Sequence, residues 1–317
     1  MEKEKELLKG RYITPKHVEA YKSGVYRALF EGIKEDPELS LEIRMNNEAM
    51  VYYHKDKILT TSLDAKDNPK VTMLDSKYYA GKGKPSVDIE NIANLRSLSK
   101  IRNYFKEAKR LVYFYKMGEE FAFQQNLAMG NHSFDKKYLV IDMEWQFSQI
   151  DLEKDQRISR TRIDLVVIDT ERNTNGFNDI YLAELKVGTG AKDGKSGIID
   201  HVNKTFEIIQ KREACSSLIQ DVTSIIANKT SLGIISGEPK EFLFAGKPKM
   251  MLISAYRGET EKLELEKEAQ KAKKRAKEIG MEEPKCILYN ALILLTEQNE
   301  HYNPSRNTPN RWLRHRI

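Results

Sequence analysis

The sequence predicts an α/β protein in which a mixed sheet flanked by helices follows a small N-terminal α+β domain. From residue 95 onward, segments of helical and alternating periodicity follow the order helix, three strands, helix, strand, charged helix, strand. Before them, one amphipathic helix precedes a series of short strands. The stretch 77–87, with Gly81, Gly83 and Pro85, is typical of a linker, so we predict domains at 1–85 and 86–317.

Length and composition agree with two soluble domains. The 317 residues correspond to roughly two domains of about 150 residues each. A hydrophobic content of 40% is sufficient for a sizeable core, and a charged content of 32% indicates a solvated surface. The 53 basic and 47 acidic residues leave a net charge of +6, which is compatible with nucleic-acid binding without being diagnostic of it.

The sequence favours a cytoplasmic protein without a membrane partner. Its two cysteines, Cys215 and Cys286, indicate no disulfide framework and are typical of a reducing compartment. The N-terminal stretch MEKEKELLKGRY has no apolar core, so we expect no signal peptide. No apolar run approaches the roughly 18 residues that a membrane-spanning helix needs.

In the N-terminal domain we expect a helix over 15–34, with Thr14 as its N-cap and Pro15 in its first turn. Short strands follow and should form an antiparallel meander, over 41–45, 50–54, 57–61 and 71–75. The domain carries no obvious chemistry. We expect it to serve recognition, regulation or self-association, through a homodimer or a partner protein.

The second domain should begin with a long helical region, 89–128, that is broken near Met117 and Gly118. The helix starting near Ile198 should bury Ile199, Val202, Phe206 and Ile209, and leave His201, Lys204 and Thr205 off that stripe. The other expected elements are strands at 137–147, 162–169, 180–187, 250–255 and 286–295, and helices at 215–228 and 261–279. In the first of these strands Asp142, Glu144 and Gln146 should form a solvated face.

Three side chains on two of these strands carry the strongest chemical signal. Glu184 and Lys186 are two positions apart on one strand and therefore share a face, and Asp164 lies on the preceding strand. Two carboxylates are common ligands of Mg²⁺, the carbonyl of Leu185 is a candidate third, and the lysine could orient water or stabilise a phosphate. The alternative is an exposed Glu/Lys pair and an unrelated aspartate. Both carboxylates lie within apolar runs, where an unpaired charge is costly.

This order of elements, with Asp on one strand and Glu-x-Lys on the next, resembles the PD-(D/E)xK nuclease superfamily, whose core is restriction-endonuclease-like. The resemblance covers roughly residues 95–295, and Ile163 stands where the superfamily often has proline. It implies that Asp164 and Glu184 hold a Mg²⁺ or Mn²⁺ ion and that Lys186 is the catalytic lysine. The superfamily often adds a glutamate from the preceding helix. Glu119 and Glu120 are the candidates here, and we favour Glu120 as a further catalytic metal ligand, with a solvated pair as the alternative.

The glycine-rich loop 188–197 and the helix after it are candidates for contacting nucleic acid. Lys192 and Lys195 in the loop, and His201 and Lys204 on the helix, could bind phosphates, although a flexible loop and a solvated helix face are alternatives. A loop that binds a nucleoside triphosphate would need its first glycine where Thr189 stands, so we reject nucleoside-triphosphate binding for this loop.

The sequence therefore predicts a Mg²⁺- or Mn²⁺-dependent nuclease that hydrolyses phosphodiester bonds. We favour DNA over RNA, and the resemblance suggests an endonuclease with a role in host defence or restriction. Two alternatives stay open. One is an RNA-directed or repair-type nuclease with the same site, and the other is a non-catalytic nucleic-acid-binding or assembly protein that keeps the fold.

Overall fold

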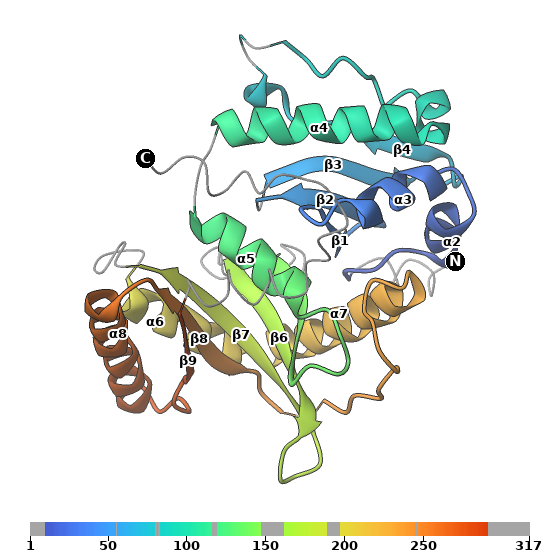
Figure 1. Ribbon diagram of the computed structural model, residues 1–317. Coiled ribbons are helices and arrows are strands. Elements are labelled where there is room, and N and C mark those ends of the chain that lie inside the picture. The colour runs from blue at the N-terminus through green and yellow to red at the C-terminus, as the bar shows by residue number, and fades with distance from the viewer. Residues whose placement is uncertain are drawn as a thin grey trace.

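The described residues fold as a mixed α/β protein with two β-sheets, an upper one from the N-terminal part and a lower one from the C-terminal part (Figure 1). The computed structural model describes residues 10–54, 56–79, 81, 83–115, 119–146, 162–188, 197–244 and 246–290. Within these residues no helix is long and apolar enough to cross a membrane.

The upper sheet is the predicted antiparallel meander, in the order β1-β2-β3-β4. The predicted first helix is instead two helices that separate after Lys22, and the Thr14 side chain caps the first by accepting the N–H of His17. The elements of this part are α2 (Pro15–Lys22), α3 (Arg27–Glu35), β1 (Ser40–Arg44), β2 (Glu48–Tyr53), β3 (Asp56–Leu63), β4 (Pro69–Thr72), and the 3-10 turns η2 (Ser76–Tyr78) and η3 (Ile92–Arg96).

The lower sheet has the order β5-β6-β7-β8-β9. Its first three strands are antiparallel, and β7, β8 and β9 run parallel, with helices in the connections. Helices α4 and α5 precede the sheet, and residues 116–118, where we predicted a break, lie outside the described residues. The elements are α4 (Leu98–Tyr115), α5 (Glu119–Gly130), β5 (Tyr138–Gln146), β6 (Arg162–Arg172), β7 (Asn178–Val187), α6 (Ile198–Gln210), α7 (Arg212–Ser231), β8 (Lys249–Tyr256), α8 (Glu259–Glu278) and β9 (Lys285–Asn290).

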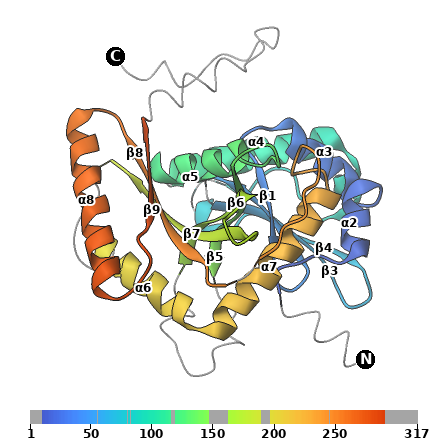
Figure 2. The same ribbon diagram turned by 90° about the horizontal axis from the view of Figure 1, so that it is seen from below.

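Helices cover both faces of the lower sheet, and strand alternation decides which residues meet which layer. Leu165, Ala183 and Leu185 pack with Leu127 and Ala128 of α5. On the other face α6 and α8 pack against β8, and α7 packs against β5. Figure 2 shows α6 and α8 on the side of the sheet away from α5.

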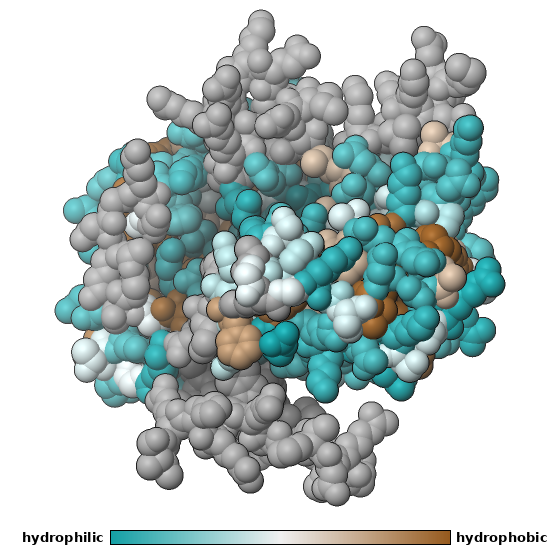
Figure 3. All heavy atoms as spheres, turned by 90° about the horizontal axis from the view of Figure 1, so that it is seen from above, coloured by the Kyte–Doolittle hydropathy of each residue, from teal (hydrophilic) through white to brown (hydrophobic). Residues whose placement is uncertain are grey.

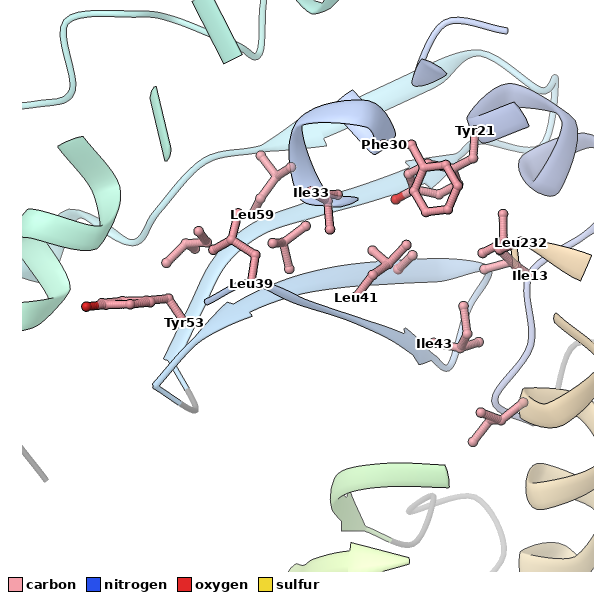
Figure 4. Close-up of a cluster of buried hydrophobic side chains, with 14 of the residues drawn as sticks. Ile13, Tyr21, Phe30, Ile33, Leu39, Leu41, Ile43, Tyr53, Leu59 and Leu232 are labelled. Atoms are coloured by element: carbon pink, nitrogen blue, oxygen red, sulfur yellow. The ribbon is translucent and has the colours of Figure 1, made fainter. Parts of the chain in front are cut away.

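The side chains of one hydrophobic core join the two parts of the chain. Figure 4 shows Tyr21, Phe30 and Ile33 of the N-terminal helices directed toward the upper sheet, and Ile13 and Leu232 beside Ile43. The same cluster continues into the lower sheet through Ile141, Val166 and Leu182. Helix α4, which we placed in the second domain, packs against α3 and β3 of the upper part. Residues on both sides of position 85 thus share one core.

Two helices test the predicted buried stripes. The spacing of Leu265, Ala269, Ala272, Ala276 and Ile279 predicts a thin stripe on α8, and the first four are buried while Ile279 is partly buried. The predicted stripe of α6 is confirmed at Val202 and Ile209 and is wrong at Ile199, and Thr205, which we expected off the stripe, is buried. Ile198, Val202, Thr205, Ile208 and Ile209 are buried, whereas Ile199 is 40% exposed.

The strand β5 corrects another expectation, because Asp142 is buried and not on a solvated face. Its carboxylate lies 2.6 Å from Nη1 of Arg11 and 2.5 Å from Nη1 of Arg44. A register shift between Val140 and Asp142 changes which side chains face the upper sheet. The sequence pattern alone could not show a partner for Asp142 that lies about one hundred residues away in the chain.

Candidate functional site

Asp164 and Glu184 lie on the antiparallel strands β6 and β7. At this end of the two strands Leu165 pairs with Ala183, and Asp164 and Glu184 are each the next residue beyond that pair. The Asp164 carboxylate accepts a hydrogen bond from the N–H of Leu185, with Oδ2 3.0 Å from the nitrogen. The structure therefore brings these two predicted residues to neighbouring positions.

Glu184 is buried and is held by two cationic or protonatable groups. Its Oε1 is 3.0 Å from Nζ of Lys186, and its Oε2 is 2.9 Å from Nδ1 of His201. Burial raises the pKa of Glu184, but the hydrogen bond and charge of His201 and the charge of Lys186 outweigh it, and the net pKa lies below the usual value of 4.5. Glu184 is therefore a carboxylate at neutral pH.

The start of α6 brings His201 to Glu184. The helix begins after Gly197, and the N–H of His201 bonds the Gly197 carbonyl at 3.3 Å. Ile198 and Val202, on either side of His201, are buried with Leu252 of β8, so this turn faces the sheet. We predicted His201 as a phosphate contact on an outer helix face. The structure instead holds its ring on the carboxylate.

Lys204 is the other predicted phosphate-binding residue that the structure describes. Lys204 forms an ion pair with Asp200 at 2.6 Å, one turn earlier on α6. Lys192 and Lys195 lie outside the described residues. For these three lysines, contact with nucleic acid stays a prediction.

The helix α5 reaches the site through a residue that we had not predicted to act there. Nε2 of Gln124 donates to the main-chain carbonyl of Asp164 at 2.6 Å and to Oε1 of Glu144 at 3.2 Å. Glu144 has a φ of 57° and also pairs with Arg162 at 2.9 Å. Nothing in the sequence distinguished Gln124 beyond its position one turn after Glu120.

Among the described residues, Glu120 is not part of a cluster of possible metal ligands. Helix α5 packs on the face of Ala183 and Leu185, whereas the Glu184 side chain points to His201 of α6. Over the described ranges, no three His, Cys, Asp or Glu side chains gather as a possible metal site. A sequence order of helix then strand cannot tell on which face of the sheet the helix packs, and a role of Glu120 at the metal stays a prediction.

The groups that do meet are nevertheless of the type that a hard divalent cation uses. Mg²⁺ commonly takes one or two carboxylates and completes its octahedron with water, so two carboxylates do not need a third protein side chain. Asp164 and Glu184 supply such oxygens, and the carbonyl of Leu185 belongs to the residue after Glu184. Their N–H, Lys186 and His201 partners are the groups with which a cation would compete.

Comparison with protein-family models, with curated proteins and with solved structures finds no significant match to this chain in any of the three.

Proposed function

We propose that the protein is a metal-dependent nuclease with a restriction-endonuclease-like lower sheet, and that DNA is its favoured substrate. The observation that carries the proposal is the group at the paired ends of β6 and β7. There the Asp164 carboxylate sits on the N–H of Leu185, beside a buried and ionised Glu184 whose oxygen is 3.0 Å from the Lys186 amine. Two carboxylates beside a lysine are the groups that phosphodiester hydrolysis needs, and we therefore favour a catalytic role for them over a purely structural one.

In this proposal Asp164 and Glu184 would hold Mg²⁺ or Mn²⁺, and the ion would supply a lower pKa for water and positive charge beside the phosphate. The Lys186 ammonium orients the attacking water or stabilises the extra negative charge on phosphorus. His201 positions Glu184 through the 2.9 Å contact with Oε2. Gln124 positions the main chain of Asp164 from the opposite layer. A role in host defence or restriction would follow from cleavage of foreign DNA.

The test is cleavage of plasmid, single-stranded DNA and RNA in the presence of Mg²⁺, Mn²⁺ or EDTA. We expect metal-dependent cleavage by the native protein, and a loss of about 100-fold or more in Asp164→Ala and Lys186→Ala, because each removes a group that acts at the phosphate. Matched controls are Asp179→Ala and Lys249→Ala, an ion pair of the same sheet at 3.1 Å. These controls should keep full activity. Cleavage that survives in both site variants would refute the assignment.

The second candidate is a nucleic-acid-binding protein without turnover. It is favoured by one observation, which is that both oxygens of Glu184 are already engaged by Lys186 and His201. A carboxylate satisfied in this way can serve to hold β7 on α6. Isothermal titration with Mn²⁺ separates the two functions. Heat of binding that Asp164→Ala abolishes supports the nuclease, and nucleic-acid binding with no metal binding supports the second candidate.

A further inference from the structure

The exposed side of helix α8 carries lysines and no acidic residue over most of its length. The helix as a whole is nearly neutral, with seven basic and six acidic residues. Over the stretch 263–277, however, its exposed residues are Leu263, Lys267, Gln270, Lys271, Lys274 and Lys277. The acidic residues of the same stretch are half-buried, namely Glu264, Glu266 and Glu268. The helix therefore separates its charges, and its outward side is cationic.

Three of these lysines have no acidic partner among the described residues, and we call Lys267, Lys274 and Lys277 the outer row of α8. The other cations of the helix each have an acid within 4.0 Å, namely Lys262, Lys271, Lys273 and Arg275. Lysines three or four positions apart repel each other and weaken a helix. The helix dipole favours cations only in the last turn, so it does not account for Lys267 or Lys274. A bound anion would offset this repulsion.

Helix α8 belongs to the layer that the Glu184 side chain faces. Glu184 contacts His201 of α6 at 2.9 Å, and α8 packs beside α6 on the same face of the lower sheet. Nε of Arg275 donates to Oδ1 of Asn203, two residues after His201, at 2.8 Å. Figure 2 shows the two helices on one side of the sheet, with α8 outermost. A nucleic acid on α8 would therefore lie on the side to which this carboxylate points.

The start of α8 adjoins the proposed site. Gly188 follows Lys186 by two residues, and a Cβ atom at Gly188 would be 3.3 Å from Nη2 of Arg257. Arg257 lies two residues before the first residue of α8. At a rise of about 1.5 Å per residue, the outer row begins about 15 Å farther on, at Lys267, and extends about another 15 Å to Lys277. At 3.4 Å per base pair, a duplex with one phosphate at the site would reach the row after about four base pairs.

The outer row presents charge without an apolar or aromatic side chain between its lysines. On the face that α4 covers, pale and brown atoms interrupt the hydrophilic surface (Figure 3). Along α8 from Lys267 to Lys277, every exposed residue is lysine or glutamine. Protein partners are bound largely through apolar and aromatic groups, and single strands through aromatic rings that stack on bases. Charge alone fits a duplex, which carries one negative charge per about 1.7 Å of its axis.

We propose that the outer row of α8 binds the phosphate backbone of duplex DNA that extends from the proposed site along this helix. The inference rests on the proposed nuclease function, and it adds that the substrate is double-stranded. Ammonium groups contact phosphates without reading bases, so the row supplies affinity and no sequence preference. Such contacts stabilise the bound substrate and the transition state equally, so they lower KM and leave kcat unchanged.

The experiment measures fluorescence anisotropy of a labelled duplex of about twenty base pairs, and of a single strand of equal length, over a range of salt concentrations in EDTA. EDTA prevents metal-dependent cleavage, so binding is read separately from turnover. The native protein should bind the duplex more tightly than the single strand. The variant with Lys267→Gln, Lys274→Gln and Lys277→Gln should make the duplex slope of log K against log salt shallower by about 2.7, since each phosphate contact contributes about 0.9. Arginine at the same three positions should keep the native slope.

The matched control removes three exposed lysines of the upper part, by Lys22→Gln, Lys66→Gln and Lys70→Gln. It changes the net charge by the same amount and should alter the slope by less than about 0.9. The melting temperature of the outer-row variant should be equal to that of the native protein or slightly higher, because like charges are removed. With Mg²⁺, the outer-row variant should have a KM for duplex cleavage raised by roughly tenfold or more and a native kcat.

Three outcomes would overturn the proposal. One is a native slope in the glutamine variant of the outer row, and another is an equal change of slope in the control, which would show only the effect of net charge. The third is tighter binding of the single strand than of the duplex. Any of these, in a protein that cleaves DNA, leaves the nuclease standing. Binding that follows the prediction while the native protein cleaves nothing refutes the nuclease and keeps the duplex-binding surface.

Discussion

Buried charges in this protein are stabilised by specific partners, and the partners differ from residue to residue. Glu184 is ionised because Lys186 and His201 together outweigh the cost of burial. Asp142 has two arginines instead, one from the N-terminal segment and one from β1. His17 is a buried titratable group whose hydrogen-bond partners, Asn47 and Thr61, are neutral, so no counter-charge stabilises its protonated form.

His17 should make the protein sensitive to acid. Burial lowers its pKa to about 4, and hydrogen bonds from its ring to Asn47 only partly oppose this. Above pH 6.5 the ring is neutral in both states. Between pH 6.5 and 4 the unfolded chain takes up a proton that the folded protein refuses, so stability falls by about 3 kcal/mol across this window. Urea unfolding of the native protein and His17→Gln at pH 7 and pH 4.5 checks this.

The variant is expected to be less stable at pH 7, because it disturbs the contacts with Asn47 and Thr61. Its loss of stability on acidification should nevertheless be smaller than that of the native protein. Parallel losses in the two proteins would show that His17 does not titrate in this window.

At the scale of elements, helices α3 and α4 come close together because one position has no side chain. Gly32 lies on the buried side of α3, and a Cβ atom there would be 2.9 Å from Cγ2 of Ile101 on α4. The close approach allows α4 to cover the upper sheet.

Gly32→Ala should therefore destabilise the protein by about 1–3 kcal/mol, because the new methyl group forces Ile101 or the helix axis to move. Gly130→Ala is a matched control at the end of α5, where a Cβ atom meets nothing within 4 Å. The control should be neutral or slightly stabilising. Thermal unfolding of both variants is the measurement, and equal melting temperatures would contradict the packing argument.

At the scale of the whole molecule, a buried ion pair holds the two sheets together in addition to the shared hydrophobic core. Lys229 of α7 is fully buried, and its Nζ is 2.7 Å from Oε2 of Glu42 on β1 and 2.8 Å from the Ile141 carbonyl on β5. One lysine thus connects the upper sheet, the lower sheet and the helix between them.

Lys229→Met should lower the free energy of unfolding by about 3–5 kcal/mol, because it leaves the Glu42 carboxylate buried without a counter-charge. Adding Glu42→Leu should recover much of this loss, since the pair is then replaced by apolar groups. Lys137→Met, which removes an exposed lysine with acidic partners, should change stability little. Chemical denaturation measures all three, and a double variant as unstable as the single one would refute this account.

The sequence by itself determined the local elements and one part of the site. Strand alternation and turn residues predicted the N-terminal meander and the strands of the second sheet, because these signals lie within a few residues of one another. Alternation also placed Glu184 and Lys186 on one face, and their oxygen and nitrogen are 3.0 Å apart. The hairpin between β6 and β7 then brought Asp164 to the Leu185 N–H.

Only the tertiary structure decided which layers meet these strands. It placed α5 on the face away from the Glu184 side chain, turned His201 onto that carboxylate, and gave Asp142 its arginines. These contacts join residues far apart in sequence, such as Lys229 and Glu42, which are 187 positions apart. Periodicity describes one element at a time. The face on which a helix packs, and the partner of a buried charge, depend on the packing of the whole chain.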